Sequence, residues 1–210
     1  MPLFYQQDIS ATTRLAIWKI EEPEAFFLGY VPLQNAITHP HKRLQHLAGR
    51  YLLQYLFPDF PIHAIQIADT RKPFLQDEQY HFSISHCGDY AAAIVSSSER
   101  IGIDIEIKRP TVAKVAHKFL HEEEINGLQA YTSEPQVLEA LTVLWCGKEA
   151  IYKWWGNGEV DFRKMIRIDD FTFGNNGVLA GRFIKNGNVF PLSLSYEAFG
   201  QLCMVWLQSK

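Results

Sequence analysis

The stretch Ile101–Ile107, with the sequence IGIDIEI, is the most informative in this chain. Alternate residues of a β-strand point to opposite faces, so the four isoleucines share one face and Asp104 and Glu106 share the other. Residues two apart on a strand lie roughly 6.5–7 Å from each other along it. Two carboxylates at that spacing on a half-buried surface repel unless a cation or a hydrogen-bond donor lies between them. The stretch therefore predicts a strand with a paired-acid face.

Two interpretations of this acid face are open. Mg²⁺ binds one or two protein carboxylates and completes its octahedral shell with water and substrate phosphate oxygens, so it would fit between Asp104 and Glu106. Alternatively, both acids are solvated residues on an edge strand, where charge discourages pairing with another chain.

A second cluster, Trp145–Lys153 with the sequence WCGKEAIYK, lies late in a stretch from about 135 to 155 that is predicted to be helical. Glu149 and Lys153 are four residues apart and share a helix face, and Glu149 interrupts an apolar stripe that would otherwise continue to Tyr152. The pair is either an exposed ion pair contributing a few tenths of a kcal/mol, or a third acid for a metal-bound diphosphate. In the second case Lys148 and Lys153 would neutralise the remaining phosphate charge.

The pattern of strands and helices along the chain predicts an α+β fold. A polar stretch at 96–100 divides the chain into an N-terminal subdomain, 1–100, and a C-terminal subdomain, 101–210, which carries both acidic clusters. Each is expected to place helices beside a small antiparallel sheet. The predicted helices are 40–57, 112–119, 122–130 and 135–155, and the predicted strands are 13–20, 64–68, 80–85, 90–96, 101–107, 171–173, 178–184, 190–196 and 201–207.

Composition limits the classes of function. The 210 residues are 47% hydrophobic, enough to bury a substantial core, and the net charge of −3 gives no general attraction for nucleic acid. Three widely spaced cysteines, Cys87, Cys146 and Cys203, suggest free thiols in a reducing compartment. No export signal precedes the first strand, and no apolar run approaches the ~20 residues of a membrane span. We therefore expect a cytoplasmic protein without a membrane partner.

The order and spacing of four motifs resemble those of the 4′-phosphopantetheinyl transferases. The two acidic clusters carry the family's signature pair, GIDIE followed about forty residues later by WCGKEAIYK. Upstream, the sequence RKP at 71–73 and FSISH at 82–86 resemble motifs of the two-domain branch, typified by the activator of surfactin synthetase. Together the motifs cover roughly residues 40 to 156.

This resemblance implies a pseudodimer of two similar subdomains, monomeric in solution, with coenzyme A in the cleft between them. It also implies transfer of 4′-phosphopantetheine from coenzyme A to a serine of an apo acyl or peptidyl carrier protein, as in fatty acid, polyketide or nonribosomal peptide synthesis. Mg²⁺, or Mn²⁺, would be the cofactor. Two rival classes are a metal-dependent hydrolase of a coenzyme A-like diphosphate and a non-catalytic homologue that binds carrier proteins.

The resemblance also suggests residues for the nucleotide. On the helix at 40–57, Arg43, His46 and Arg50 share one face, which is either a solvated basic face or a docking surface for the 3′-phosphate of coenzyme A. Among these, Arg50 and then Arg43 match the family best. In the upstream motifs the residues expected around the nucleotide phosphates are Lys72, Pro73, Ser85 and His86, although a lone histidine is more often structural.

The resemblance assigns the chemical roles within the C-terminal subdomain. Asp104, Glu106 and Glu149 would hold the metal, and Lys153 would stabilise the leaving bisphosphate. Either Glu149 or Glu124 would accept the serine proton. Glu124 belongs to the run 122–124, which would otherwise be a solvated helix start.

Overall fold

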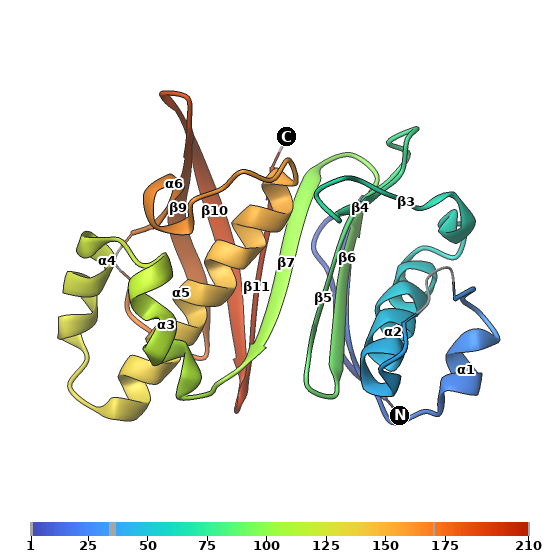
Figure 1. Ribbon diagram of the computed structural model, residues 1–210, viewed down its shortest axis with the longest axis horizontal. Helices are drawn as coiled ribbons and strands as arrows, with labels where there is room; N and C mark the ends of the chain where they lie inside the picture. The colour runs from blue at the N-terminus through green and yellow to red at the C-terminus, as the bar shows by residue number, and fades with distance from the viewer. Residues whose placement is uncertain (1, 34–36, 170, 210) are drawn as a thin grey trace. The chain divides into compact units, whose positions relative to one another are not determined.

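A computed structural model describes residues 2–33, 37–169 and 171–209. Contacts between Cα atoms divide the chain into two compact units, the first ending at Ile103 and the second running from Asp104 to Ser209. The division lies inside a strand, a few residues beyond the boundary expected from sequence. Each unit contains a mainly antiparallel sheet and a long helix packed on it (Figure 1), so the α+β class is confirmed, whereas pseudodimer symmetry stays a prediction.

Unit 1 is built on a four-stranded antiparallel sheet in the order β1-β2-β6-β5. Helix α2 packs against β6, β2 and β5, and the short helix α1 lies against α2. A separate two-stranded sheet pairs β3 with β4. The elements of this unit are β1 (Leu3–Asp8), β2 (Thr13–Lys19), α1 (Glu24–Leu28), α2 (Pro40–Leu56), the 3₁₀ helix η1 (Ile62–Ala64), β3 (Gln66–Ile67), β4 (Pro73–Phe74), β5 (His81–Cys87) and β6 (Tyr90–Ser96).

Local chemistry explains the length and packing of α2. Pro40 occupies the first helical turn, where its missing N–H costs nothing, and the His39 side chain accepts a hydrogen bond from the backbone of Lys42. A side chain at Gly49 would place its Cβ 2.5 Å from Ile84 Cγ2. The glycine therefore lets the helix approach β5 closely, although glycine is a poor helix former.

Unit 2 is built on a five-stranded sheet in the order β7-β11-β10-β9-β8. The long helix α5 packs along β11 and also contacts β8, while α3 packs against α5. The elements are β7 (Arg100–Ile107), which begins in unit 1, α3 (Thr111–Phe119), α4 (Glu122–Gly127), the 3₁₀ helix η2 (Leu128–Ala130), α5 (Glu134–Trp155), α6 (Phe162–Met165), β8 (Ile166–Ile168), β9 (Asn176–Lys185), β10 (Asn188–Phe199) and β11 (Leu202–Ser209).

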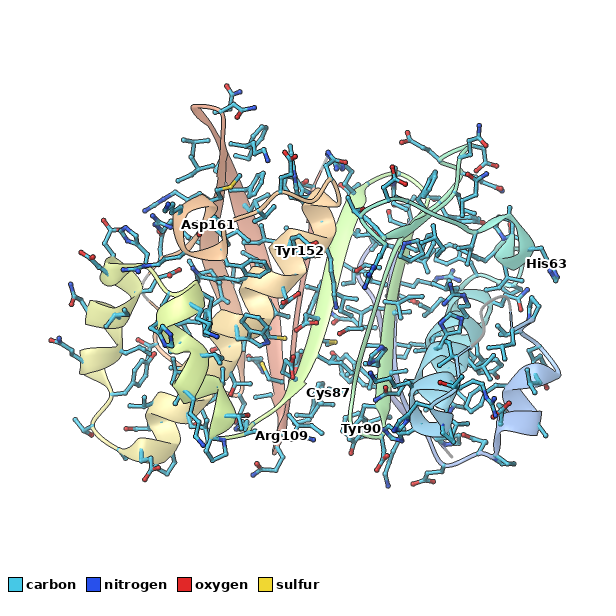
Figure 2. The ribbon with its side chains drawn as sticks, in the orientation of Figure 1. His63, Cys87, Tyr90, Arg109, Tyr152 and Asp161 are labelled. Atoms are coloured by element: carbon cyan, nitrogen blue, oxygen red, sulfur yellow. The ribbon has the colours of Figure 1, made fainter. Side chains whose placement is uncertain are left out.

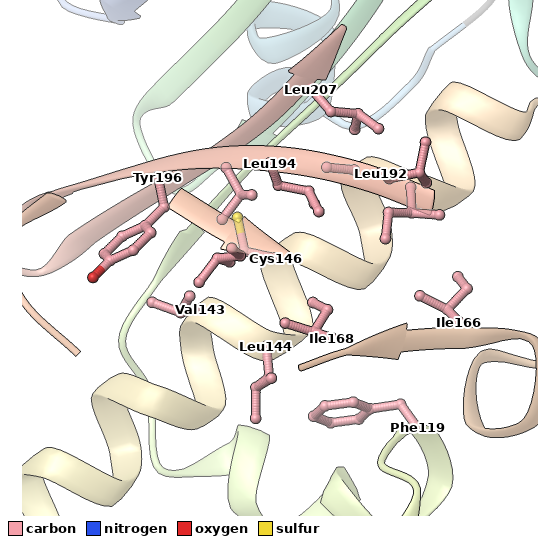
Figure 3. Packing of buried hydrophobic residues seen from close by; sticks show 14 of the residues in the cluster. Phe119, Val143, Leu144, Cys146, Ile166, Ile168, Leu192, Leu194, Tyr196 and Leu207 are labelled. Carbon is pink, nitrogen blue, oxygen red and sulfur yellow. The ribbon is translucent and has the colours of Figure 1, made fainter. Parts of the chain in front are cut away.

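Helix α5 has clear start and stop signals. Ser133 and Gln136 form a capping box at its N-terminus, and Gly156 ends it in the left-handed conformation at φ 75°. Its apolar face joins the core drawn in Figure 3, where Cys146, Val143 and Leu144 pack with residues from β8 and β10. As in α2, a glycine allows close packing, because a Cβ at Gly147 would lie 2.6 Å from Ile168 Cδ1.

Most predicted elements are present, with two clear departures. The strand predicted at 171–173 is wrong, because residues 171–174 form no regular element and the sheet's edge strand is β8 at Ile166–Ile168. The strand predicted at 64–68 shrinks to Gln66–Ile67, since η1 occupies residues up to Ala64. Strands β1 and β4 and helices α1 and α6 are additions to the predicted elements. The three cysteines are free, as expected.

Candidate active site

The two acids of β7 both interact with side chains of α5. Asp104 is 4% exposed, and its Oδ1 accepts a hydrogen bond from Lys153 Nζ at 2.6 Å. Glu106 Oε1 accepts a hydrogen bond from the indole Nε1 of Trp145 at 3.1 Å. The alternation of the strand thus directs both carboxylates toward the helix that carries the second motif.

Glu149 shares the electrostatic environment of these two acids. Burial raises its pKa to about 7, the negative charges of Asp104 and Glu106 add to the rise, and the ammonium of Lys153 opposes it. A carboxyl group with a pKa near neutrality can exchange a proton at physiological pH, which suits a general base.

The side chains at this site are oxygen donors of the kind that a hard divalent metal binds. Among the residues that the structure describes, no three carboxylate, imidazole or thiol side chains already form a group that could hold a metal ion. Mg²⁺ does not require such a group, because it commonly binds one or two protein carboxylates and takes its other ligands from water and substrate. Asp104 and Glu106 raise the pKa of Glu149 by repulsion between negative charges, and a cation beside these oxygen donors would relieve that repulsion, so the donor set fits an ion of this kind.

An open groove lies beside Trp145. It has a volume of about 750 Å³, and it is lined by apolar and charged side chains: Phe119, Trp145, Val160, Phe162 and Met165 together with Lys118, Glu159 and Asp161. The Trp145 ring stacks on Phe162, with the ring centroids 5.8 Å apart, while its indole N–H holds Glu106. The groove is therefore connected to the acid cluster through one side chain. Figure 2 shows the neighbouring side chains Tyr152, on α5, and Asp161, at the start of α6.

Glu124 has other partners than the acids of β7 and is buried within unit 2. It is 4% exposed, and its Oε2 accepts hydrogen bonds from the His121 backbone and from Lys148 Nζ, at 2.8 and 2.6 Å. Its Oε1 accepts a hydrogen bond from the Ile168 backbone at 2.9 Å. Because both oxygens are occupied, this arrangement gives Glu124 a structural role and does not favour it as the general base.

Lys148 is the partner of Glu124 and is fully buried. Besides the carboxylate, its Nζ donates to the backbone carbonyls of Phe119, Phe162 and Ile166 at 2.8, 3.1 and 2.9 Å. Burial lowers its pKa to about 8 even though Glu124 acts in the opposite direction. Its ammonium links α5 to the ends of α3, α6 and β8, and this use of its donors disagrees with the expected role as a phosphate ligand.

In unit 1, the two arginines predicted to bind phosphate differ. Arg43 forms a two-nitrogen ion pair with Glu24, at 2.8 Å from Nε and 2.7 Å from Nη2 to the same carboxylate oxygen. Arg50 is 6% exposed, and its Nη1 donates to His46 Nδ1 at 3.1 Å. Glu24 therefore already neutralises Arg43, whereas Arg50 contacts a neutral ring.

The upstream motifs place further polar residues in the same unit. Lys72 directly precedes β4, which begins at Pro73, and burial together with the charge of Arg100 lowers its pKa to about 8. Ser85 is buried in β5, and His86 follows it on the same strand with an exposed side chain. Cys87 and Tyr90 flank the turn after this strand (Figure 2).

Two contacts go beyond what the sequence analysis predicts. His46 shares the predicted basic helix face with Arg50, and their spacing of four residues is the signal that could predict the hydrogen bond between them. The hydrogen bond from Trp145 to Glu106 could not be predicted, since it depends on how α5 lies across β7. No helix among the described residues is long and apolar enough to cross a membrane.

The comparisons with known proteins agree on one family. Residues 100–203 match the family model of the 4′-phosphopantetheinyl transferase superfamily. Relatives include enterobactin synthase component D of Salmonella typhi, 35% identical over 115 residues, which are 53% of this chain and 47% of that protein. The 4′-phosphopantetheinyl transferase psf-1 of Bacillus pumilus is 36% identical over 119 residues, or 53% of this chain and 50% of the relative. A 4′-phosphopantetheinyl transferase of Bacillus subtilis is 37% identical over 93 residues, or 44% and 41%. The matched regions thus span about half the length of these curated relatives.

Proposed function

Residues 100–203 belong to the 4′-phosphopantetheinyl transferase superfamily, and from this membership we propose that the chain transfers 4′-phosphopantetheine from coenzyme A to a serine of an apo acyl or peptidyl carrier protein. Adenosine 3′,5′-bisphosphate would be the second product. The observation that supports this proposal most is the convergence of Asp104, Glu106 and Glu149 with Lys153 at the contact of β7 and α5, within the matched region.

In this proposal Asp104 and Glu106, with Glu149 beside them, are the residues that would hold Mg²⁺. When bound, the ion would supply positive charge to the diphosphate of coenzyme A. A pH titration of Glu149 tests the fit without measuring turnover, because added Mg²⁺ is expected to move its pKa from about 7 toward lower values.

The chain's own residues carry the proton and part of the charge. Glu149 accepts the proton of the attacking serine hydroxyl, since its unprotonated form is available at physiological pH, with a pKa of about 7 in the metal-free chain and a lower one when a cation lies beside it. Lys153 stabilises the negative charge that develops on the leaving bisphosphate, while its hydrogen bond to Asp104 keeps the ammonium in place. The groove beside Trp145, with apolar side chains among its walls, offers a place for the pantetheine arm.

Residues of unit 1 hold the nucleotide end of coenzyme A in this proposal. Arg50 binds the 3′-phosphate, and Lys72 and His86 contribute positive charge to the nucleotide phosphates. Arg43 has a smaller part because Glu24 already neutralises it. A cytoplasmic location and a monomeric state stay predictions; the first rests on the cysteine pattern.

The test is incubation of the purified chain with coenzyme A, Mg²⁺ and a panel of apo carrier proteins, read by intact mass. A mass increase of one phosphopantetheine on a carrier is expected, with strong loss for Asp104→Ala and Glu149→Gln. Lys153→Ala is expected to lower kcat more than it weakens coenzyme A binding. Lys164→Ala, which alters an exposed lysine on α6, is the matched control.

Two outcomes would contradict the role of the metal, and two others would contradict the transfer activity. Wild-type rates in Asp104→Ala, or full activity in EDTA, would remove the metal from the mechanism. Release of free phosphopantetheine without any carrier protein would instead identify a hydrolase. Binding of carrier proteins with no transfer to any of them would identify a non-catalytic homologue.

A further inference from the structure

Trp145 holds one acid of the candidate site and lies beside another. Its indole Nε1 donates to Glu106 Oε1 at 3.1 Å, across the contact of α5 with β7. It also lies four residues before Glu149, so the two side chains share a face of α5. A glutamate side chain has several rotatable bonds, and fixing it before a ligand arrives removes an entropic cost from binding. The hydrogen bond therefore preorganises Glu106.

Two aromatic rings bracket the indole of Trp145. Phe119, at the end of α3, meets it edge to face with the ring centroids 4.9 Å apart. Phe162, at the start of α6, stacks on it at 5.8 Å with an angle of 23° between the ring planes. Both arrangements are favourable for aromatic pairs. The bracket thus restrains the indole in the position from which it donates to Glu106.

A single buried ammonium holds the backbone of both bracketing residues. Lys148 Nζ donates to the carbonyl oxygens of Phe119 at 2.8 Å and of Phe162 at 3.1 Å. Its charge is paired with Glu124 at 2.6 Å, and its side chain is fully buried. Lys148 follows Trp145 by three residues on α5, so the ammonium and the indole extend from neighbouring positions of the helix. The buried ion pair is therefore connected to the acid site through the two rings and the indole.

We propose that Trp145 is a positioning residue for the divalent metal. It holds Glu106 in the orientation in which this acid acts with the other two acids, and Lys148 keeps the indole in place through the Phe119 and Phe162 bracket. Groups that hydrogen-bond to metal ligands commonly determine the orientation of those ligands and the affinity for the ion. The identity of the ion rests on the proposed function, whereas the hydrogen bond and the bracket rest on the contacts described above.

Calorimetric titration of the full chain with MnCl₂, in the presence of saturating coenzyme A, tests the positioning role. Trp145→Phe keeps an aromatic ring but loses the N–H donor, so it is expected to weaken Mn²⁺ binding about ten- to hundredfold. Trp154→Phe is the matched control, because Trp154 lies on the same helix and its Nε1 donates to Ser209 Oγ at 2.8 Å. Each substitution removes one indole hydrogen bond from α5, and the control should bind Mn²⁺ like the wild type.

A second pair of variants tests the bracket. Phe162→Leu removes the stacked ring but keeps an apolar side chain and the carbonyl that accepts from Lys148. It is expected to weaken Mn²⁺ binding about two- to tenfold, less than Trp145→Phe does. Phe190→Leu removes a ring that meets Trp154 with the centroids 6.5 Å apart, and it is the matched control.

The indole N–H provides a readout that a purely structural tryptophan would not give. In proton–nitrogen correlation spectra, the Trp145 signal is identified by its loss in Trp145→Phe. Added Mg²⁺ should shift this signal with the midpoint of metal binding, because a cation beside Glu106 alters the carboxylate to which the indole donates. The Trp154 signal should stay in place.

The outcomes separate this inference from the function on which it rests. If the wild type binds Mn²⁺ and Trp145→Phe binds it equally well, the positioning role fails and the proposed function stands. Equal losses of Mn²⁺ affinity in Trp145→Phe and Trp154→Phe would show a structural role and overturn the inference. Unchanged binding in Phe162→Leu would overturn the role of the bracket. If the wild type with coenzyme A binds neither Mn²⁺ nor Mg²⁺, the metal site of the proposed function fails together with the inference.

Discussion

Lys148 and Arg50 are two buried cations in equivalent local settings, and their partners differ completely. Each follows a glycine in the long helix of its unit, and each glycine lets the helix approach an isoleucine of the sheet. Lys148 has a carboxylate at 2.6 Å and three backbone carbonyls. Arg50 has one neutral imidazole and an unused donor. Burial of a cation therefore says little about ligand binding until its hydrogen bonds are accounted for.

The difference separates stability from binding. A cation with all its donors used holds neighbouring elements together, so removing it should damage the fold. A cation with unused donors weakens the fold until a ligand arrives, so removing it should damage only binding.

The largest expected effect is on the Lys148 side of the comparison. Lys148→Met leaves Glu124 as an unpaired buried carboxylate and frees three carbonyls, so we expect a loss of about 3–5 kcal/mol in the free energy of unfolding. Urea denaturation measures it. The double variant Glu124→Gln with Lys148→Met should lose less than the sum of the single variants, and a loss below about 1 kcal/mol for Lys148→Met would contradict the structural role.

The pH dependence of stability should reveal the raised pKa of Glu149 in the folded chain. Its pKa rises from the ordinary 4.5 to about 7 on folding, so between these values the folded chain holds a proton that the unfolded chain has released. Stability is then present at low pH and lost as pH rises toward 7, by roughly 1–3 kcal/mol. Urea unfolding in metal-free buffer from pH 5 to 8 should show this slope. Glu149→Gln should flatten it, and an identical slope in both proteins would refute the shifted pKa.

The glycines that precede the two buried cations, Gly49 and Gly147, are expected to differ in how well they tolerate a side chain. An added Cβ at Gly49 meets the γ-methyl of a stiff, β-branched Ile84, so Gly49→Ala should cost about 1–3 kcal/mol. At Gly147 it meets only the terminal Cδ1 of Ile168, which can rotate away, and alanine gains up to about 1 kcal/mol in helix propensity. Gly147→Ala should therefore change stability little. Denaturation midpoints that reverse this order would contradict the packing argument.

The smallest effect on stability is expected at Arg50. Arg50→Met removes one hydrogen bond but also a buried charge without a counter-charge, so the free energy of unfolding should stay within about 1 kcal/mol of the wild type. Thermal and urea denaturation of the ligand-free protein measure it. If Arg50→Met lowered the free energy of unfolding as much as Lys148→Met does, Arg50 would be a structural residue like Lys148.

The sequence predicts what depends on periodicity and misses what depends on packing. Helices α2 and α5 and strand β7 are recognisable because their apolar residues repeat at the period of the element. The edge strand β8 is not recognisable, because three residues are too few to show an alternation of apolar and polar side chains. The aromatic residues at 171 and 173 have a higher strand propensity and favoured the wrong segment.

The candidate site shows the same division. That Asp104 and Glu106 share a face follows from the alternation of β7, and both indeed reach α5. The motif does not predict that Lys148 is buried while its neighbour Glu149 is partly exposed. It depends on how α5 rotates against the sheet, which brings three carbonyls around Lys148.

The hydrogen bond from Trp145 to Glu106 gives the acid cluster an optical reporter. The indole N–H donates to the carboxylate at 3.1 Å, and the ring stacks on Phe162. Indole emission is sensitive to nearby charge and to the strength of such a bond, so any cation that engages Glu106 should change the fluorescence of this one ring. The difference spectrum between the wild type and Trp145→Phe would isolate that signal from the other four tryptophans. Events at the carboxylates could then be followed in solution, without a label.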